Sequence, residues 1–323
     1  MNWLSGEHCE STTLANLLLS RGIEVSEPLI FGLGRGISFL YWNSKHMPAP
    51  FLGGRVKPDH LIRNATGALG VELLESETAS QAKAERELLA ALDAGEAVGL
   101  KLDRFHLDYA HDSFHFAAHY LTCVGYTAET YTVVETQGLG VQTTGRAALA
   151  RARAAKGPMS SRSLSFRLGR NGYDPRTLPG ACREAIAATA ADFLEPPITN
   201  MGHKGFQKAA KAMRGWCDTL DDPRAAFTFL SHSIEDGGTG GGFFRTLWAD
   251  FLDEAAELAD EPAYASVART YRELSTRWTR VAELLRDESE PAAMRKAADE
   301  AAVILEDLGR AERDAMSKLA VTP

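Results

Sequence analysis

The four cysteines and nine histidines are the residues of this chain best suited to nucleophilic or metal chemistry. The cysteines show no CxxC or other paired spacing: they are Cys9, Cys123, Cys182 and Cys217. Scattered cysteines in a cytoplasmic chain, which we expect this to be, stay reduced, and zinc sites usually show closely spaced ligands. We therefore expect no metal site and ask which thiol could be reactive.

Cys9 stands where a helix is expected to begin. Residues 8–21 place leucines at helical spacing, and Gly22 is suited to end the helix. The first N–H groups of a helix and the positive end of its dipole stabilise a thiolate. The other three thiols lie in predicted strands or helices, where core packing is the simpler interpretation. Cys9 is therefore the candidate nucleophile.

A cysteine nucleophile needs an imidazole and a third group that orients the imidazole. His119 precedes a predicted strand at 120–126, and Glu135 lies near the end of the next strand, 131–136. Antiparallel neighbours joined by a hairpin place these two residues at the same end of a sheet. Three other histidines compete for the role: His106, His111 and His115. The order cysteine, histidine, acid is that of papain-like folds, and it predicts Cys9, His119 and Glu135 as catalytic residues.

The elements that must position these residues fall into two parts. The first part mixes helices at 8–21, 79–94 and 144–156 with strands at 97–103, 120–126, 131–136 and 163–168, and it contains an apolar run at 37–42. Beyond it the periodicity is helical, at 179–194, 203–219, 222–233, 242–260, 262–286 and 291–318. The segment 169–178 carries Gly, Asn, Asp and Pro without periodicity and predicts a boundary. We expect an α+β fold with a papain-like domain at 1–170 and an all-helical domain at 171–323.

Charge and hydropathy exclude several function classes. The formal net charge is −8, and no basic block compensates it locally, which argues against a nucleic-acid partner. The sequence contains no run of eighteen apolar residues, so we expect no membrane span. The first residues, MNWLSGEHCEST, lack the basic and apolar regions of a signal peptide, so the expected location is the cytoplasm.

Several motifs resemble a known protein family. The segment Gly6-Glu-His-Cys9-Glu-Ser11, then Glu27, the glycine-rich 31–39 run and the strand from His119 to Gly125-Tyr126 are similar to the butirosin biosynthesis protein H N-terminal domain. Residues 238–252 resemble the helical domain of unknown function that often follows it. The resemblance implies a papain-like fold related to bacteriocin-processing cysteine peptidases. For the founding member, the resemblance implies an acyltransferase. That enzyme would transfer an acyl group from the phosphopantetheine thioester of a carrier protein to an amine of an aminoglycoside.

The resemblance and the residues together predict an acyltransferase of natural-product biosynthesis. Its expected partners are an acyl carrier protein and a small-molecule amine, and a homodimer is left open. No cofactor is expected, because thioester exchange is close to isoenergetic and no GxxxxGK[ST] phosphate loop is present. Two alternatives remain. One is a cysteine hydrolase (peptidase, amidase or thioesterase) with the same site, and the other is a non-catalytic helical scaffold or binding protein.

Six further residues are candidate substrate contacts: His8, Gly34, Asp103, Tyr109, Asp236 and Arg245. His8 flanks Cys9, and Gly34 belongs to the glycine-rich loop that follows the Cys9 helix. Asp103 and Tyr109 lie in the strand and the Leu/Tyr segment that contribute to the resemblance. The glycines at 237–242 predict a turn that permits close helix packing, and Asp236 and Arg245 would touch substrate if this turn lay over the site.

Overall fold

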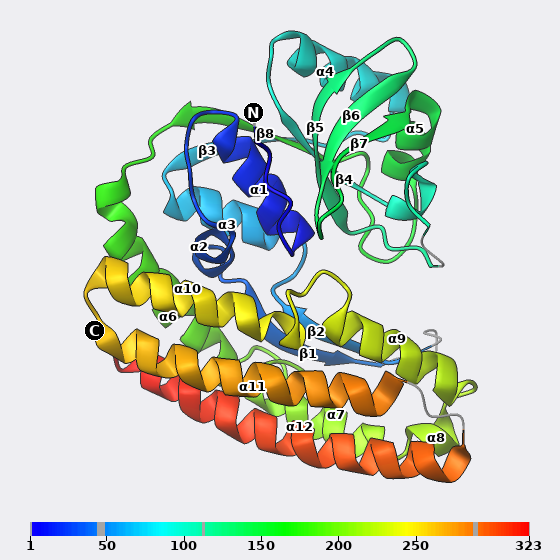
Figure 1. Cartoon of the computed structure of the whole chain (residues 1–323), viewed down its shortest axis with the longest axis vertical. Helices are drawn as coiled ribbons and strands as arrows, with labels where there is room; N and C mark the ends of the chain where they lie inside the picture. The colour runs from blue at the N-terminus through cyan, green and yellow to red at the C-terminus, as the bar shows by residue number, and fades with distance from the viewer. Residues whose placement is uncertain (1, 44–48, 112–113, 287–289, 323) are drawn as a thin grey trace. The chain divides into compact units, whose positions relative to one another are not determined.

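The computed structural model describes residues 2–43, 49–111, 114–286 and 290–322 (Figure 1). The chain forms two compact units. The sheet unit comprises residues 1–30 and 58–175, and the helical unit comprises 31–57 and 176–323. The predicted α+β class and the helical C-terminal part are confirmed. The papain-like assignment and the domain limits 1–170 and 171–323 stay predictions.

The sheet unit is built on one antiparallel sheet with the strand order β3-β8-β4-β5-β6-β7. Its strands are β3 (Val71–Ser76), β4 (Val98–Leu102), β5 (His119–Tyr126), β6 (Thr130–Glu135), β7 (Gly140–Gly145) and β8 (Ser165–Asn171). The hairpin predicted between β5 and β6 is confirmed, with Thr122 opposite Val134 and Tyr126 opposite Tyr131. The last strand in sequence, β8, lies between β3 and β4.

Helices cover both faces of this sheet. One core joins α4 (Gln81–Asp93) and α5 (Arg146–Ala154) to the apolar side chains of β4, β5 and β6. Gly99 alternates with these side chains on β4 and therefore faces the opposite side. A Cβ there would lie 2.9 Å from Thr13 of α1 (Cys9–Leu19), so this glycine lets α1 pack directly on the strand. The helix that carries Cys9 is thus seated on the central strands.

Another helix of the sheet unit, α3 (His60–Ala68), is capped by a side chain of α1. This helix begins after Asp59, whose side chain makes no cap hydrogen bond. The Asp59 carboxylate instead binds Lys101 Nζ at 2.8 Å and the Tyr120 hydroxyl at 2.6 Å. The cap acceptor is instead the buried carboxylate of Glu10 in α1, which accepts the Ile62 N–H at 3.1 Å. Such an acceptor satisfies one of the first backbone N–H groups of the helix, which have no acceptor within the helix itself.

The helical unit packs long helices around an aromatic core. Its helices are α6 (Leu178–Leu194), α7 (Gly202–Met213), α8 (Trp216–Thr219), α9 (Pro223–Glu235), α10 (Arg245–Ala259), α11 (Pro262–Arg286) and α12 (Pro291–Ala320). The buried residues of α11 recur every three or four positions, as one face of a helix requires. On α12 a Cβ at Gly309 would lie 2.7 Å from Phe206 of α7, so this glycine permits close helix contact.

A two-stranded hairpin from early in the chain belongs to the helical unit. Strands β1 (Ile37–Trp42) and β2 (Phe51–Arg55) pair antiparallel. Phe39 stacks on Phe206 with ring centroids 3.8 Å apart. Backbone bonds add to this, because Tyr41 N–H donates to the Asn200 carbonyl at 2.9 Å. Helix α2 (Glu27–Leu33) precedes the hairpin.

In the part of the chain that the structure describes, no helix combines the length and apolar character needed to span a bilayer. This agrees with the expectation from hydropathy.

Candidate active site

The start of helix α1 is fixed by a buried carboxylate. Glu27 accepts the N–H groups of Glu7 and His8, each at 2.8 Å. It also accepts the hydroxyls of Ser11 and Thr12 at 2.8 and 2.9 Å. His8 is the N-cap residue, and its ring Nδ1 accepts from Ser11 N–H. Cys9 is the first helical residue and is half-buried.

The segment before Cys9 is tied to the strand end that carries Glu135. Ser5 Oγ donates to the Glu135 carbonyl at 3.0 Å, and Gln137 N–H donates to the Gly6 carbonyl at 2.7 Å. Asn16 of α1 holds the same segment by two bonds with the backbone of Leu4. These long-range bonds align the helix start with the end of β6. Sequence analysis missed Ser5 and Asn16, because only the folded chain brings their partners close.

His119 and Glu135 form a buried pair at one end of the sheet. His119 Nε2 lies 2.9 Å from Oε2 and 3.0 Å from Oε1 of Glu135. The Tyr109 hydroxyl donates to Glu135 Oε1 at 2.8 Å, and Thr136 N–H donates to Oε2 at 3.2 Å. The Glu135 side chain is fully buried. The carboxylate is therefore held by three groups: the Tyr109 hydroxyl, the Thr136 N–H and the His119 imidazole.

The Cys9 side chain completes the arrangement by hydrogen bonding to His119. Burial lowers the pKa of His119, but the Glu135 charge and the bonds with Cys9 and Glu135 outweigh it and raise the pKa to about 10. The imidazole therefore carries a proton at neutral pH. A cation beside a thiol stabilises the thiolate form.

Glu135 is ionised in the same arrangement. Burial acts to raise the pKa of this carboxyl, and the charge and hydrogen bond of His119 oppose it, helped by Tyr109 and Thr136. The net effect lowers the pKa of Glu135. A carboxylate that stays charged can hold the imidazolium in one orientation.

The remaining thiols have different surroundings. Burial raises the pKa of Cys123 and of Cys182 to about 12. Burial also raises the pKa of Cys217, which is half-buried near Arg295 and Asp218. None of these three pKa shifts comes from a histidine.

Three candidate substrate contacts belong to the sheet unit, and each has a protein partner. Tyr109 binds Glu135 and so supports the site. His8 is buried and caps α1. Asp103 is buried after β4 and accepts backbone N–H groups of Phe105 and Phe116. Their contact with substrate stays a prediction.

The other three candidates belong to the helical unit. Gly34 lies in the turn after α2. Asp236 ends α9 and forms an exposed ion pair with Arg286. Arg245 is fully buried, with its guanidinium bound to Glu312 and to the carbonyls of Gly54, Phe243 and Ser38. This burial leaves Arg245 no surface through which to meet substrate in this structure, and its bonds assign it to holding the unit together.

The chain matches two known family descriptions. Residues 8–136 match Butirosin biosynthesis protein H, N-terminal. Residues 147–319, more than half of the chain, match Domain of unknown function (DUF4872). The chain belongs to the DUF4872 family. The resemblance described from the sequence is thus confirmed, for both the N-terminal domain and its companion. None of the curated proteins matches the chain.

The two family segments do not coincide with the two units. The DUF4872 segment begins within α5 and includes β8, both of which belong to the sheet unit. Conversely, the butirosin-type segment contains β1 and β2, which belong to the helical unit. Each family segment therefore contributes strands to the unit that the other dominates.

Proposed function

We propose that this chain is a cysteine-dependent acyltransferase of natural-product biosynthesis with a papain-like sheet unit. The observation that supports it is the hydrogen-bonded chain Cys9–His119–Glu135, extended by Tyr109. A nucleophile at a helix start, a base beside it and a buried carboxylate behind the base are the parts that covalent catalysis requires. The match to the butirosin-type N-terminal domain supports a biosynthetic role.

In the first step the thiolate of Cys9 attacks the carbonyl carbon of an acyl thioester. A bond forms between Cys9 Sγ and this carbon, and the donor's carbon–sulfur bond breaks. The departing thiolate takes the proton that His119 carries at neutral pH. The Cys9 backbone N–H, at the first helical position, donates to the oxyanion. The product is an S-acyl Cys9 and a neutral His119.

In the second step an amine attacks the acyl-enzyme. Neutral His119 accepts the amine proton, the amide bond forms, and the Cys9 thiolate is released beside the restored imidazolium. Glu135 remains ionised throughout and holds the ring through Nε2. The sequence of bonds is balanced without a nucleotide or redox cofactor. We propose a phosphopantetheine thioester on a carrier protein as donor.

Intact-mass spectrometry with an acyl-N-acetylcysteamine thioester tests the nucleophile. We expect one acyl adduct on the full chain and none on Cys9→Ala. The matched control is Cys217→Ala, which removes the other half-buried thiol and should still form the adduct. An adduct that persists on Cys9→Ala would refute the proposal.

Product analysis then separates transfer from hydrolysis. An added amine should yield amide in preference to free acid as the acyl-enzyme decays. Free acid as the sole product across a panel of amines would support the hydrolase alternative. Absence of any acyl adduct would support the scaffold alternative.

A further inference from the structure

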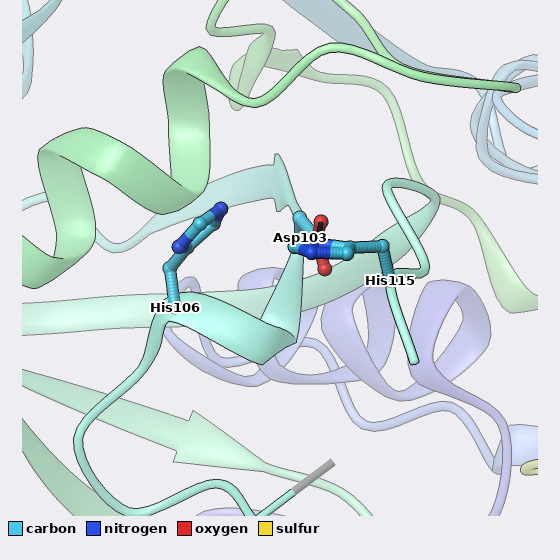
Figure 2. Close-up of side chains that lie close together, drawn as sticks. All are labelled: Asp103, His106 and His115. Atoms are coloured by element: carbon cyan, nitrogen blue, oxygen red, sulfur yellow. Dashed lines mark hydrogen bonds and ion pairs between the residues drawn. The ribbon is translucent and has the colours of Figure 1, made fainter. Parts of the chain in front are cut away.

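A second cluster of chemistry-bearing side chains lies in the sheet unit. Asp103, His106 and His115 each offer a ligand atom, and these atoms all lie within 4.8 Å of one another. Figure 2 shows the three side chains together beside the end of β4. We propose that they bind a divalent transition-metal ion, with Zn²⁺ the ion that their chemistry favours.

Asp103 supplies a fixed carboxylate. Its side chain is 2% exposed, and Oδ1 accepts the N–H groups of Phe105 and Phe116 at 3.2 and 3.1 Å. Oδ2 lies 2.7 Å from His115 Nδ1. Hydrogen bonds that orient a ligating group are a regular part of metal sites. Here they hold one oxygen toward the two imidazoles.

The two histidines are accessible from solvent. The His115 side chain is 60% exposed, and His106 is half-buried. Their ring centroids lie 5.5 Å apart, and the Phe105 ring contacts both, at 4.0 Å from His115 and 5.5 Å from His106. An ion therefore has an entry path, and a water molecule can occupy a fourth position.

The donor set favours zinc over the alkaline-earth cations. Two imidazoles and one carboxylate with a solvent position are a recurrent Zn²⁺ ligand set, whereas Mg²⁺ and Ca²⁺ take oxygen ligands. Tetrahedral bonds of ~2.0–2.1 Å place ligand atoms ~3.3 Å apart. The 2.7 Å between Asp103 Oδ2 and His115 Nδ1 must therefore lengthen slightly, and any pair of ligand atoms near the 4.8 Å limit must approach. An exposed His115 side chain can make that movement.

Binding replaces a proton with the ion. His115 Nδ1 and Asp103 Oδ2 share a hydrogen bond, and Nδ1 must lose its proton to coordinate metal. That proton moves to Nε2 or to solvent. With neutral imidazoles and one carboxylate, a bound Zn²⁺ leaves the site with one net positive charge.

Metal binding would tie together both ends of the segment between β4 and β5. Asp103 and His106 stand just after β4, and His115 stands shortly before His119. Tyr109, which binds Glu135, lies between them. The ion would thus restrain the segment that leads to His119 without itself joining the acyl-transfer chemistry.

Calorimetric titration with ZnCl₂ alone tests the site. The parent should be the full chain with Cys9→Ala and Cys217→Ala, which removes the two half-buried thiols that could bind zinc. We expect one equivalent to bind, and His106→Ala or His115→Ala to weaken binding by at least ~10–100-fold. The matched control is His111→Ala, an exposed histidine in the same segment, which should bind as the parent does.

Co²⁺ absorption identifies the ligands independently of affinity. We expect visible bands typical of nitrogen and oxygen ligands, lost in His115→Ala. Absence of saturable zinc binding would overturn the proposal. The proposal would also be overturned if the His106→Ala and His115→Ala variants bound zinc as tightly as the parent does. A thiolate-to-cobalt charge-transfer band would overturn it as well. Because the parent lacks Cys9, the result does not depend on the acyltransferase proposal.

Discussion

Both units contain a buried ion pair, and the two pairs differ in what surrounds them. In the sheet unit, His119 and Glu135 pair at 2.9 Å, and the imidazole also meets the Cys9 thiol. In the helical unit, Arg245 and Glu312 pair at 2.8 Å with both side chains fully buried. Trp278 Nε1 donates to Glu312, and the Arg245 guanidinium lies over the Trp278 ring.

The difference lies in which partner can change its charge. A guanidinium stays protonated at any ordinary pH, so the Arg245 pair can hold structure but cannot transfer protons. An imidazolium can give up its proton to a leaving group and take it back. Burial and hydrogen bonding are therefore common to both pairs. The neighbouring thiol and the titratable imidazole distinguish the His119 pair from the Arg245 pair.

The largest expected effect is on catalysis, from Glu135→Gln. The amide keeps the shape of the side chain but cannot stabilise the imidazolium. In a serine protease the corresponding change lowers kcat about 10⁴-fold, and we expect a loss on the order of 10³–10⁴ in the single-turnover acylation rate. Rapid-quench mass spectrometry measures that rate. An acylation rate equal to that of the parent would place Glu135 outside the chemistry.

The next effect is on stability, from Arg245→Met. Removing one partner of a buried pair leaves an uncompensated charge and costs about 3–5 kcal/mol. The midpoint of urea unfolding should fall accordingly. The double variant Arg245→Met with Glu312→Leu should recover part of the loss. Recovery stays incomplete because three backbone carbonyls and the Trp278 N–H lose their partners.

If Arg245→Met destabilises the chain as much as Glu312→Lys, which adds a buried cation, the result does not separate loss of the ion pair from loss of packing. The double variant Arg245→Met with Glu312→Leu makes that separation and is the decisive control. If the double variant is as unstable as the single one, the charge pair is not what stabilises the core. The matched comparison in the sheet unit is Glu135→Gln. This variant should slow acylation strongly and lower the midpoint of urea unfolding only slightly.

The pH dependence of stability separates the two pairs further. The folded pKa of His119 is raised from 6.5 to about 10. Its contribution is therefore fully present below pH 6.5 and is lost as the pH rises through about 10, by up to a few kcal/mol. Unfolding of the parent and of His119→Gln, measured from pH 6 to 10, should converge at the alkaline end. Arg245→Met should keep its deficit throughout, because a guanidinium does not titrate in this range.

Much of the local structure follows from the sequence, and the reason is periodicity. The helix at Cys9, the β5–β6 hairpin and the long helices α11 and α12 carry strong apolar patterns, and each is confirmed. The sequence analysis assigned no strand to the apolar run that forms β1, and it missed α2, α3, β2, β3 and β7. Short elements depend on tertiary contacts, as β8 does where it lies between β3 and β4.

The site was predictable in part for a related reason. Chain order and hairpin geometry place His119 near Glu135 without knowledge of distant contacts. Tyr109 was predicted as a substrate contact, whereas the structure also shows it bound to Glu135. Glu27 and Ser5 act through partners up to 130 residues away, and no local pattern reports such contacts. The same holds for the buried environment of Arg245.

The smallest expected effect comes from Ser5→Ala. Ser5 Oγ donates to the Glu135 carbonyl and accepts from Gly140 N–H at 3.2 Å, so it fastens the segment before Cys9 to the β6–β7 turn. Losing these bonds should cost about 1 kcal/mol of stability. If the same bonds also align Cys9 with His119, acylation should slow more in Ser5→Ala than in the control Ser233→Ala, whose half-buried side chain donates to the Phe229 carbonyl within α9. A Ser5→Ala chain that loses stability but acylates at the parent rate would show that the tether stabilises the fold without aligning the thiol.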